Sequence, residues 1–428
     1  MACNLNVEVI INEHSVFKKK SLIGYVKDEL LKRTVLRLGS KITTFELEAL
    51  QENVEAIFIC ELGRENNSFE FSGDGSTVNV SDVDLCIHIY RLNREGAVAE
   101  SIGGDEGETT AATHYMLPAT SFHGLWESLI FDSDIKTDLL QYARAMLYLS
   151  KCGVNSQLIS CNRVVLLHGP PGTGKTSLCK ALAQKISVRM ADIYSQAVLV
   201  EINSHGLFSR FFSESGKLVS RLFSKFAEMA ADPRTLVFIL VDEVESLAHS
   251  RASFTGNEPS DAIRVVNALL THLDMLKEHC NVMILTTSNI TGAIDIAFVD
   301  RADIKAFIPQ PSPFAIYSIY HSCLEELLRV GVIIGTCPDK MKDRKKFLDV
   351  QSETSKHLGI GNTEIPLIEL ARESEGLTGR SLRKVPLRVL STQLVPEKVI
   401  RLEEFIAAML TVVKQMKSEQ LEINKNNQ

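Results

Sequence analysis

A glycine-rich run near the middle of the chain has the residue types of a phosphate-binding loop. Residues 169–176 fit the pattern G-x-x-x-x-G-K-[ST], in which glycines let successive backbone N–H groups point at phosphate oxygens. Lys175 would reach the β- and γ-phosphates of a nucleotide, and the hydroxyl of Thr176 would face Mg²⁺. The alternative is a chance match on a turn. The eight residues are Gly169, Pro170, Pro171, Gly172, Thr173, Gly174, Lys175 and Thr176.

The segments on either side of this loop have the character that phosphate binding requires. The mostly apolar residues 163–168 indicate a buried strand, and residues 177–183 have the pattern of a helix start. The N-terminus of such a helix adds a favourable dipole for an anion. The context therefore favours a phosphate site over a chance match.

Two adjacent carboxylates follow a second apolar segment. Residues 236–241 are continuously apolar, which suits a strand buried on both faces of a parallel sheet. Ligands bind at the carboxyl edge of such sheets. Asp242 would therefore hold Mg²⁺, and Glu243 would orient an attacking water molecule. The alternative is an acidic, solvated helix start.

Asn289 follows a third predicted buried strand, residues 282–288, at the same predicted edge of the sheet. Its amide could hydrogen-bond the attacking water or the γ-phosphate. Asparagine is also a common turn former, so position alone leaves both interpretations open.

The elements that must position these residues predict an α/β fold with three parts. Alternating strands and helices in residues 116–311 predict a large domain with a five-stranded parallel sheet and right-handed crossovers. Residues 312–428 predict a helical lid domain with a polar tail, and residues 1–99 a separate α/β N-terminal domain. Residues 100–115 are acidic and glycine-rich, which predicts a flexible linker that lets the N-terminal domain swing.

Composition argues against several classes of protein. The net charge of −7 argues against a protein that coats nucleic acid. The first residues lack the blocks of a signal peptide, and no apolar run approaches the roughly 20 residues of a membrane span, so we expect no membrane association. Nine scattered cysteines without a C-x-x-C pair predict reduced thiols in a cytosolic or nuclear protein.

Taken in order, these motifs resemble the AAA+ ATPases, and within them the pachytene-checkpoint remodellers of the thyroid-receptor-interactor type. The similarity covers residues from about 116 to 415, and the segments 297–305 and 211–215 are more particular than the phosphate loop. The resemblance implies an ATPase that uses ATP and Mg²⁺. It assigns Asn289 as a first sensor of the nucleotide and Arg380, in the lid, as a second. The segments that carry the resemblance are 168–183, 208–219, 241–247, 260–267, 286–290, 297–305 and 375–380.

The resemblance also implies residues that act between subunits and on a substrate. Arg301 is the best candidate for an arginine finger that reaches a neighbouring subunit, although the usual arginine-proline-glycine-arginine run is shortened around it and Arg264 is a rival. Phe211, followed by Phe212, falls where unfoldases place a pore-loop aromatic that grips an extended polypeptide. The alternative is that these rings pack against the domain's own helix. Residues 250–257 are a candidate second pore loop.

A remodeller of this family is a homohexamer whose substrates are HORMA-domain proteins of checkpoint and meiotic chromosome-axis complexes, taken in some cases through a HORMA adaptor that docks on the N-terminal domain. Hydrolysis would convert a closed, partner-bound form into an open one. The expected location is the nucleus and chromosomes, with kinetochores and cytoplasm as further sites. Two rival classes stay open: a nucleic-acid-directed AAA+ machine, and a nucleotide-gated scaffold that hydrolyses slowly.

Overall fold

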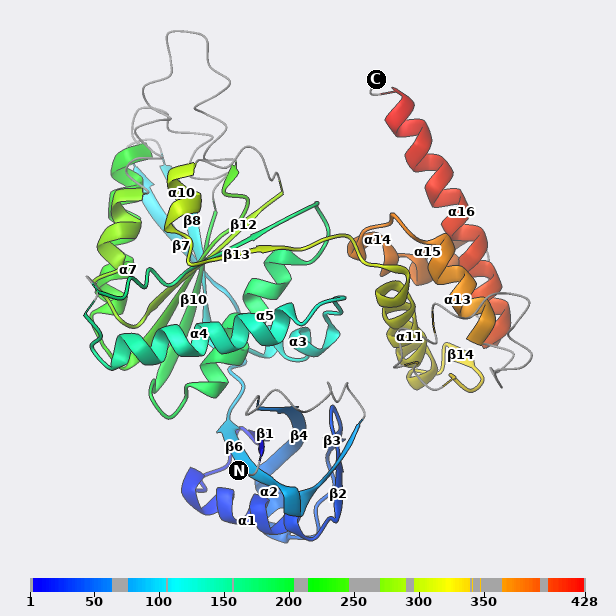
Figure 1. Ribbon diagram of the computed structural model, residues 1–428, viewed down its shortest axis with the longest axis horizontal. Coiled ribbons are helices and arrows are strands. Elements are labelled where there is room, and N and C mark those ends of the chain that lie inside the picture. The colour runs from blue at the N-terminus through cyan, green and yellow to red at the C-terminus, as the bar shows by residue number, and fades with distance from the viewer. Residues whose placement is uncertain are drawn as a thin grey trace.

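The chain folds into an N-terminal domain, a large sheet-containing domain and a helical lid (Figure 1). This organisation agrees with the predicted fold class. In the part of the chain that the structure describes, no helix is both long enough and apolar enough to span a bilayer. The computed structural model describes residues 3–63, 76–104, 107–155, 158–203, 215–245, 270–289, 296–338, 341, 347, 364–392 and 399–426.

The N-terminal domain is a small sheet with a helix packed on one face. Its elements are β1 (Cys3–Ile11), α1 (Lys19–Leu31), β2 (Val35–Arg37), β3 (Lys41–Ile42), α2 (Glu48–Asn53), β4 (Val54–Leu62), β5 (Thr77–Asn79) and β6 (Val83–Tyr90). The main sheet has the order β3-β4-β1-β6, and β1 is parallel to β6 and antiparallel to β4. Leu5, Val7 and Val9 of β1 share an apolar cluster with Leu22 and Val26 of α1. The apolar face of α1, which repeats about every 3.6 residues, thus packs against the apolar face of β1, which repeats every second residue.

The large domain is built on one sheet with helices on both faces. Its elements are β7 (Val98–Gly104), β8 (Gly107–Leu117), α3 (Leu125–Ser128), α4 (Ile135–Lys151), β9 (Val164–His168), α5 (Lys175–Arg189), β10 (Gln196–Ile202), α7 (Ser215–Ala230), β11 (Thr235–Val241), β12 (Val282–Ser288), α10 (Ile296–Arg301) and β13 (Ile304–Phe307). The strand order is β13-β9-β12-β11-β10-β8-β7, and the first five strands are parallel. The sheet therefore has seven strands, where the sequence predicted five.

The central strand β11 is buried on both faces, as its continuous apolar run predicts. Ile239 shares an apolar cluster with Phe226 of α7, whereas the adjacent Phe238 shares another with Leu182 of α5. Because successive side chains of a strand point to opposite faces, the two clusters lie on the two sides of the sheet. This double burial fixes the carboxyl ends of the parallel strands.

The two additional strands come from the segment predicted to be a flexible linker, and that prediction was wrong. Strands β7 and β8 form an antiparallel hairpin, and β8 pairs antiparallel with β10. Ala111 and Ala112 are buried, and Glu100 of β7 makes ion pairs with His114 and with Lys225 of α7, the latter at 2.5 Å. The segment is ordered by backbone pairing to the edge of the sheet and by these ion pairs. Its composition alone indicates a linker.

The lid is a helical domain that begins at a capped helix. Its elements are α11 (Pro313–Arg329), β14 (Ile333–Ile334), α13 (Glu364–Glu373), α14 (Gly379–Leu382), α15 (Val385–Thr392), β15 (Ile400–Arg401) and α16 (Leu402–Asn426). The hydroxyl of Ser312 accepts from the N–H of Ala315, and Pro313 occupies the first turn of α11, where its missing N–H costs nothing. Helix α16 continues through most of the polar tail.

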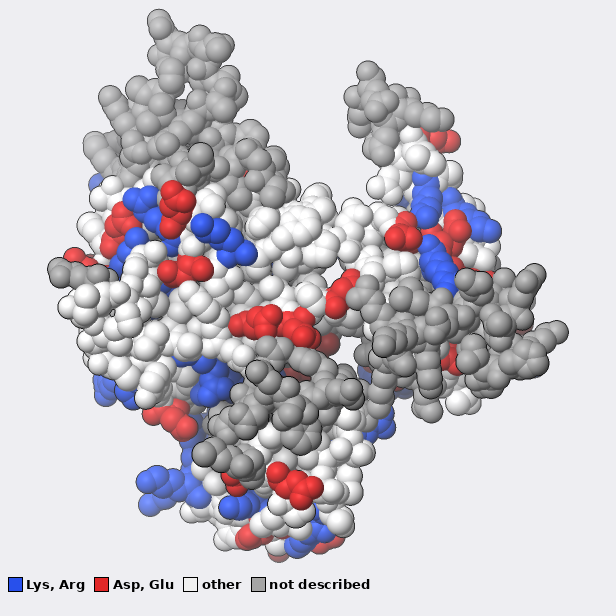
Figure 2. All heavy atoms as spheres, viewed as in Figure 1, with Lys and Arg blue, Asp and Glu red and all other residues white. Residues whose placement is uncertain are grey.

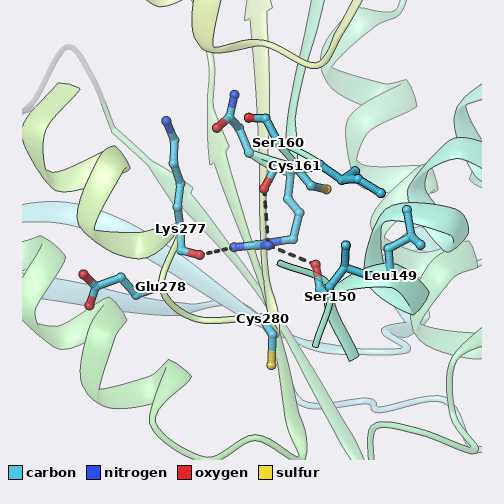
Figure 3. A pocket seen from close by; sticks show the side chains of 11 residues that line it. Leu149, Ser150, Ser160, Cys161, Lys277, Glu278 and Cys280 are labelled. Atoms are coloured by element: carbon cyan, nitrogen blue, oxygen red, sulfur yellow. Dashed lines mark hydrogen bonds between the residues drawn. The ribbon is translucent and has the colours of Figure 1, made fainter. Parts of the chain in front are cut away.

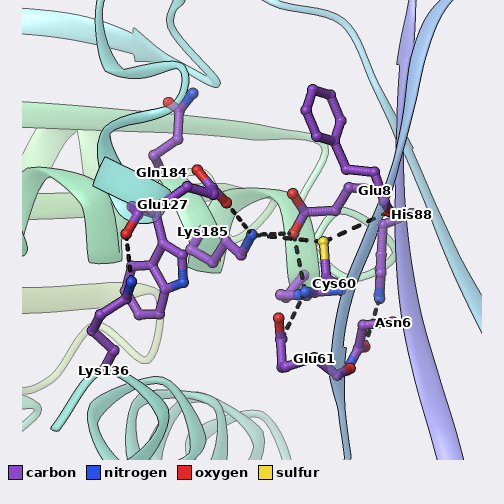
Figure 4. Close-up of polar contacts among 12 residues, drawn as sticks. Asn6, Glu8, Cys60, Glu61, His88, Glu127, Lys136, Gln184 and Lys185 are labelled. Atoms are coloured by element: carbon purple, nitrogen blue, oxygen red, sulfur yellow. Dashed lines mark hydrogen bonds and ion pairs between the residues drawn. The ribbon is translucent and has the colours of Figure 1, made fainter. Parts of the chain in front are cut away.

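The N-terminal domain contacts the large domain through a buried group of charged residues (Figure 4). The carboxylate of Glu8, on β1, makes ion pairs with Lys185 at 2.8 Å and Arg189 at 3.0 Å, both on α5. Glu61 of β4 pairs with Arg189 at 2.7 Å, and Glu127 of α3 with Lys185 at 3.1 Å. The predicted free swing of this domain is therefore at odds with the structure, in which the domain is held on the helix that follows the phosphate loop.

Burial shifts the titration of the groups in this contact. Burial tends to raise the pKa of Glu8, but the attraction of Lys185 and Arg189 outweighs it and the pKa falls below its ordinary value. Burial likewise lowers the pKa of His88 to about 4 and raises the pKa of the Cys60 thiol to about 12. At neutral pH, Glu8 is therefore charged, whereas His88 and Cys60 are neutral.

The surface charge agrees with the acidic composition. On the face drawn in Figure 2, the Lys and Arg side chains of the described residues are interspersed with Asp and Glu and form no continuous basic stripe. A stripe of that kind is the usual electrostatic footprint of nucleic-acid binding.

Candidate functional site

The phosphate loop lies between β9 and α5, as predicted. Gly169, Gly172 and Gly174 have φ values of 143°, 75° and 95°, in the region that favours glycine. A Cβ at Gly169 would collide with the carbonyl of Ile308, which follows β13. The loop thus needs glycine both for its curl and for close packing against the neighbouring strand.

Lys175 is buried at the start of α5, with its ammonium directed into the loop. Its Nζ donates to the carbonyl oxygens of Gly169 at 2.8 Å and Pro170 at 2.7 Å. Burial lowers the pKa of Lys175, and the carboxylates of Glu245 and Asp242 oppose that effect. A buried ammonium bonded to neutral carbonyls inside a curled loop fits phosphate oxygens, which are stronger acceptors.

The predicted acidic pair meets the loop at the carboxyl edge of the sheet. Thr176 donates through its hydroxyl to Asp242 Oδ1 at 2.8 Å. A hydroxyl and a carboxylate side by side are the oxygen ligands that Mg²⁺ prefers, so these two residues fit that ion. Glu243 follows with a φ of 53°, a left-handed conformation that is uncommon outside glycine.

Asn289 completes the group from the adjacent strand. It follows β12, which pairs with β11, and its Nδ2 donates to Glu243 Oε1 at 3.0 Å. The structure therefore brings together four residues that the sequence singled out separately: Thr176, Asp242, Glu243 and Asn289. Their chemical roles stay predictions.

Two residues that sequence reasoning did not single out hold this group in place. The hydroxyl of Thr287 accepts from the N–H of Glu243 at 3.1 Å and donates to Asp242. Glu245 accepts from the N–H of Asn289 at 2.9 Å. The available signal for Thr287 was the run of polar residues at the end of an otherwise apolar strand, residues 286–288.

The lid contacts the phosphate loop through the segment that carries Arg380. The N–H of Arg380 donates to the carbonyl of Gly172 at 3.2 Å, and the hydroxyl of Thr378 caps α14 by accepting from Ser381. The charge of Arg380 lies near enough to Lys175 to lower its pKa slightly. Arg380 is therefore on the phosphate side of the lid, as a sensor would be.

A small, largely apolar hollow lies beside the loop, between the large domain and the lid. It is lined by Phe131, Ile135 and Ile308 of the large domain and by Ile319 and Gly379 of the lid. Its volume is about 40 Å³, far below the roughly 300–1,000 Å³ that is typical of ligand pockets.

The hinge into the lid is fastened by a carboxylate that sequence reasoning missed. Asp132 accepts from the N–H of Ser312 at 2.9 Å and also from its hydroxyl. Because Ser312 caps the first lid helix, Asp132 ties that helix to the large domain.

Arg301 does not join this group. It lies at the end of α10, where its Nε and Nη2 donate to the carboxylate of Asp274 at 3.0 and 2.8 Å. Those hydrogen bonds lower the pKa of Asp274, and Lys277 pairs with the same carboxylate at 2.6 Å. Three of the other predicted positions, Phe211, Phe212 and Arg264, lie outside the described residues, as do residues 250–257.

A separate pocket of about 430 Å³ lies at the opposite, amino edge of the parallel strands (Figure 3). Arg163 lies within it and donates to the carbonyls of Val282, Lys277 and His279 and to the hydroxyl of Ser150. Because Arg163 is bonded mainly to main-chain carbonyls, we assign it a structural role. None of the predicted site residues lines this pocket.

Three family descriptions match the chain. Residues 165–310 match the ATPase family associated with various cellular activities (AAA). Residues 312–417 match the TRIP13-like AAA+ ATPase lid C-terminal domain, and residues 2–95 match the TRIP13 N-terminal domain. Together these matches cover most of the sequence.

Whole-length relatives agree with the family descriptions. A pachytene checkpoint protein 2 homolog from Xenopus tropicalis is 43% identical over 426 residues, which span 99% of this chain and 96% of that protein. The Homo sapiens homolog is 43% identical over 410 residues, spanning 96% and 92%. A solved structure of C. elegans PCH-2 has a TM-score of 0.75 and 37% identity, covering 97% of this chain and 99% of that chain.

A more distant solved structure shares the fold. It is that of the E. coli MS115-1 HORMA:CdnC:Trip13 complex, with a TM-score of 0.51 and 18% identity, covering 69% of this chain and 93% of that chain.

Proposed function

The chain belongs to the TRIP13-like, pachytene checkpoint protein 2 family of AAA+ ATPases, and from that premise we propose that it uses ATP hydrolysis to convert HORMA-domain proteins from a closed, partner-bound form to an open form. Membership makes the chain a nucleotide-binding ATPase. A HORMA protein as substrate is supported by the name of the distant complex, in which a Trip13 protein is assembled with one. The working form we propose is a homohexameric ring.

The observation that carries the proposal is the junction of two hydrogen-bonded pairs at one sheet edge, Thr176 with Asp242 and Asn289 with Glu243. Thr176 and Asp242 would hold Mg²⁺, which supplies positive charge next to the β- and γ-phosphates. Lys175 would exchange its two loop carbonyls for phosphate oxygens. In this arrangement the γ-phosphate would lie beside the carboxylate of Glu243.

Glu243 would orient a water molecule and accept its proton as the water oxygen bonds to the γ-phosphorus. The bond between that phosphorus and the β-γ bridging oxygen breaks, and ADP and phosphate are released. Asn289 would orient Glu243 and the water through hydrogen bonds. Arg380 would bind the γ-phosphate and so couple the lid to the presence of that phosphate.

We propose Arg301 as the finger that serves the neighbouring subunit's nucleotide. This requires Arg301 to leave Asp274 or to share it, because the Nε–Nη2 edge of its guanidinium is bonded to that carboxylate. Arg264 stays the rival. A finger of this kind is worth about 10³–10⁵ in rate in related phosphoryl-transfer enzymes.

Substrate handling would fall to the pore and the N-terminal domain. Phe211, with Phe212, would grip an extended segment of the substrate, and the N-terminal domain would dock the substrate, in some cases through a HORMA adaptor. The targets we propose are checkpoint and meiotic chromosome-axis complexes in the nucleus and on chromosomes, with kinetochores and cytoplasm as further locations.

The ATPase rate of the full chain tests this proposal. It is measured alone, with a HORMA-domain protein and its adaptor, and with single-stranded DNA. Stimulation by the HORMA complex that is lost in Phe211→Ala, with ATP binding intact, would support threading. Stimulation by DNA alone would favour a nucleic-acid-directed machine. A slow rate that no partner raises would favour a nucleotide-gated scaffold.

A further inference from the structure

The side-chain hydroxyl of Thr287 contacts both members of the acidic pair, Asp242 and Glu243. Thr287 lies in β12, and 1% of its surface is exposed. Its hydroxyl oxygen accepts from the N–H of Glu243 at 3.1 Å, and its hydroxyl proton is donated to Asp242 Oδ1. Its main-chain carbonyl accepts from the N–H of Val244 at 2.9 Å. One threonine thus contacts three consecutive residues after β11.

These contacts act on the residue with the least favourable backbone conformation at the site. Glu243 has a φ of 53°, which a residue with a Cβ holds only where its surroundings fix it. The bond from its N–H to Thr287 and the next bond, from Val244, clamp the chain on both sides of the Glu243 carbonyl. Without the hydroxyl, this hydrogen bond of the Glu243 N–H would be lost, and the chain could relax toward an ordinary conformation.

The same hydroxyl sets the orientation of the carboxylate beside Glu243. Asp242 Oδ1 accepts from both Thr176 and Thr287, so its carboxylate plane is fixed from two sides. Thr176 comes from the phosphate loop and Thr287 from β12. A hydroxyl carries a donor and an acceptor on one atom, so Thr287 can accept from the Glu243 N–H and donate to Asp242 at once.

We propose that Thr287 is a positioning residue for ATP hydrolysis, which holds Glu243 in its left-handed conformation and fixes Asp242 for the metal. This rests on the proposed roles of Asp242 and Glu243. Groups that orient metal ligands without touching the metal typically change activity 10- to 100-fold when removed.

The test compares Thr287→Val, which keeps the branched shape and removes the hydroxyl, with Thr287→Ser, which keeps the hydroxyl. We expect kcat of the valine variant to fall about 10- to 100-fold. The KM for ATP should change far less, because the phosphate loop is untouched. The serine variant should recover most of kcat. If the valine variant folds poorly, Thr287→Ala replaces it in the same comparison with serine.

Thr286→Val is the matched control. Thr286 is also buried in β12, but its hydroxyl donates to the carbonyl of Val165 on the other neighbouring strand. We expect this variant to lose stability and to keep kcat per folded molecule. Wild-type kcat in Thr287→Val, or an equal loss of kcat in both valine variants, would overturn the assignment.

Glu243→Gln separates this inference from the proposed function. If Glu243→Gln hydrolyses ATP at the wild-type rate, the role proposed for Glu243 is wrong and the premise fails with it. If Glu243→Gln is inactive while Thr287→Val is fully active, only the role of Thr287 is wrong.

Discussion

Replacing Glu8 with glutamine should loosen the N-terminal domain from the helix that follows the phosphate loop. The side chain is 5% exposed and lies 2.8 and 3.0 Å from the cationic groups of Lys185 and Arg189. Removing one partner of a buried ion pair costs about 3–5 kcal/mol, because the other charge stays buried. Glu61 and Glu127 still pair with the two cations, so we expect the lower end, about 3 kcal/mol.

The effect should depend on pH in a defined direction. The pKa of Glu8 is lower in the folded chain than its ordinary value of 4.5. A lowered folded pKa contributes stability that is fully present above the unfolded pKa and is lost as pH falls through the folded pKa. The difference in unfolding free energy between wild type and Glu8→Gln should therefore be constant near pH 7 and shrink below about pH 4–5.

Hydrogen exchange of the amides of β1 and β4 in the full chain measures this loss. A loss of about 3 kcal/mol raises the open population about 150-fold, since 1.36 kcal/mol is a factor of ten. Glu13→Gln is the control, because Glu13 pairs with Arg94 at 3.1 Å on the exposed surface of the same domain, where such pairs contribute about 0–1 kcal/mol. Equal protection in both variants would refute the reasoning.

Of three other predictions, two concern the nucleotide site and one the hinge into the lid. Lys175→Ala subunits lack the ammonium proposed to bind phosphate, and Arg301→Ala subunits lack the proposed finger. Mixing the two should restore ATPase activity that neither has alone, whereas full activity of Arg301→Ala by itself would contradict a trans role. Removing Mg²⁺ with a chelator should abolish turnover and adding it back should restore it, whereas turnover that persists would count against the site of Thr176 and Asp242. Asp132→Asn should weaken the bonds to Ser312 by about 1.5–3 kcal/mol, seen as faster hydrogen exchange at the start of α11; unchanged exchange there would mean that other contacts set the hinge.

Local patterns were enough to predict the parts of the site that follow strand ends. The phosphate loop depends on glycines and Lys175 within eight residues, and Asp242 and Glu243 follow directly from an apolar strand. Pairing of β11 with β12 then places Asn289 beside Glu243. In these cases the residues that follow neighbouring parallel strands lie close together, because the carboxyl ends of those strands share one edge of the sheet.

Features that depend on distant pairing were missed. The acidic, glycine-rich composition of residues 100–115 pointed to a linker. Strands β7 and β8 form because β8 pairs with the edge strand β10, and local composition does not reveal that distant pairing. Glu8 is a charged residue in a strand, and only the arrival of Lys185 and Arg189 from the large domain explains its burial. Asp132 and Ser312 are 180 positions apart, and no local pattern links them.

Comparison of Glu243→Gln with wild type tests the central claim most directly. ATP binding and single-turnover hydrolysis are measured on the same preparations. The site described above predicts that the variant binds ATP with near wild-type affinity and hydrolyses it at least about 100-fold more slowly, because the water loses the carboxylate that accepts its proton. Hydrolysis at the wild-type rate would contradict the claim that this sheet edge is the catalytic site.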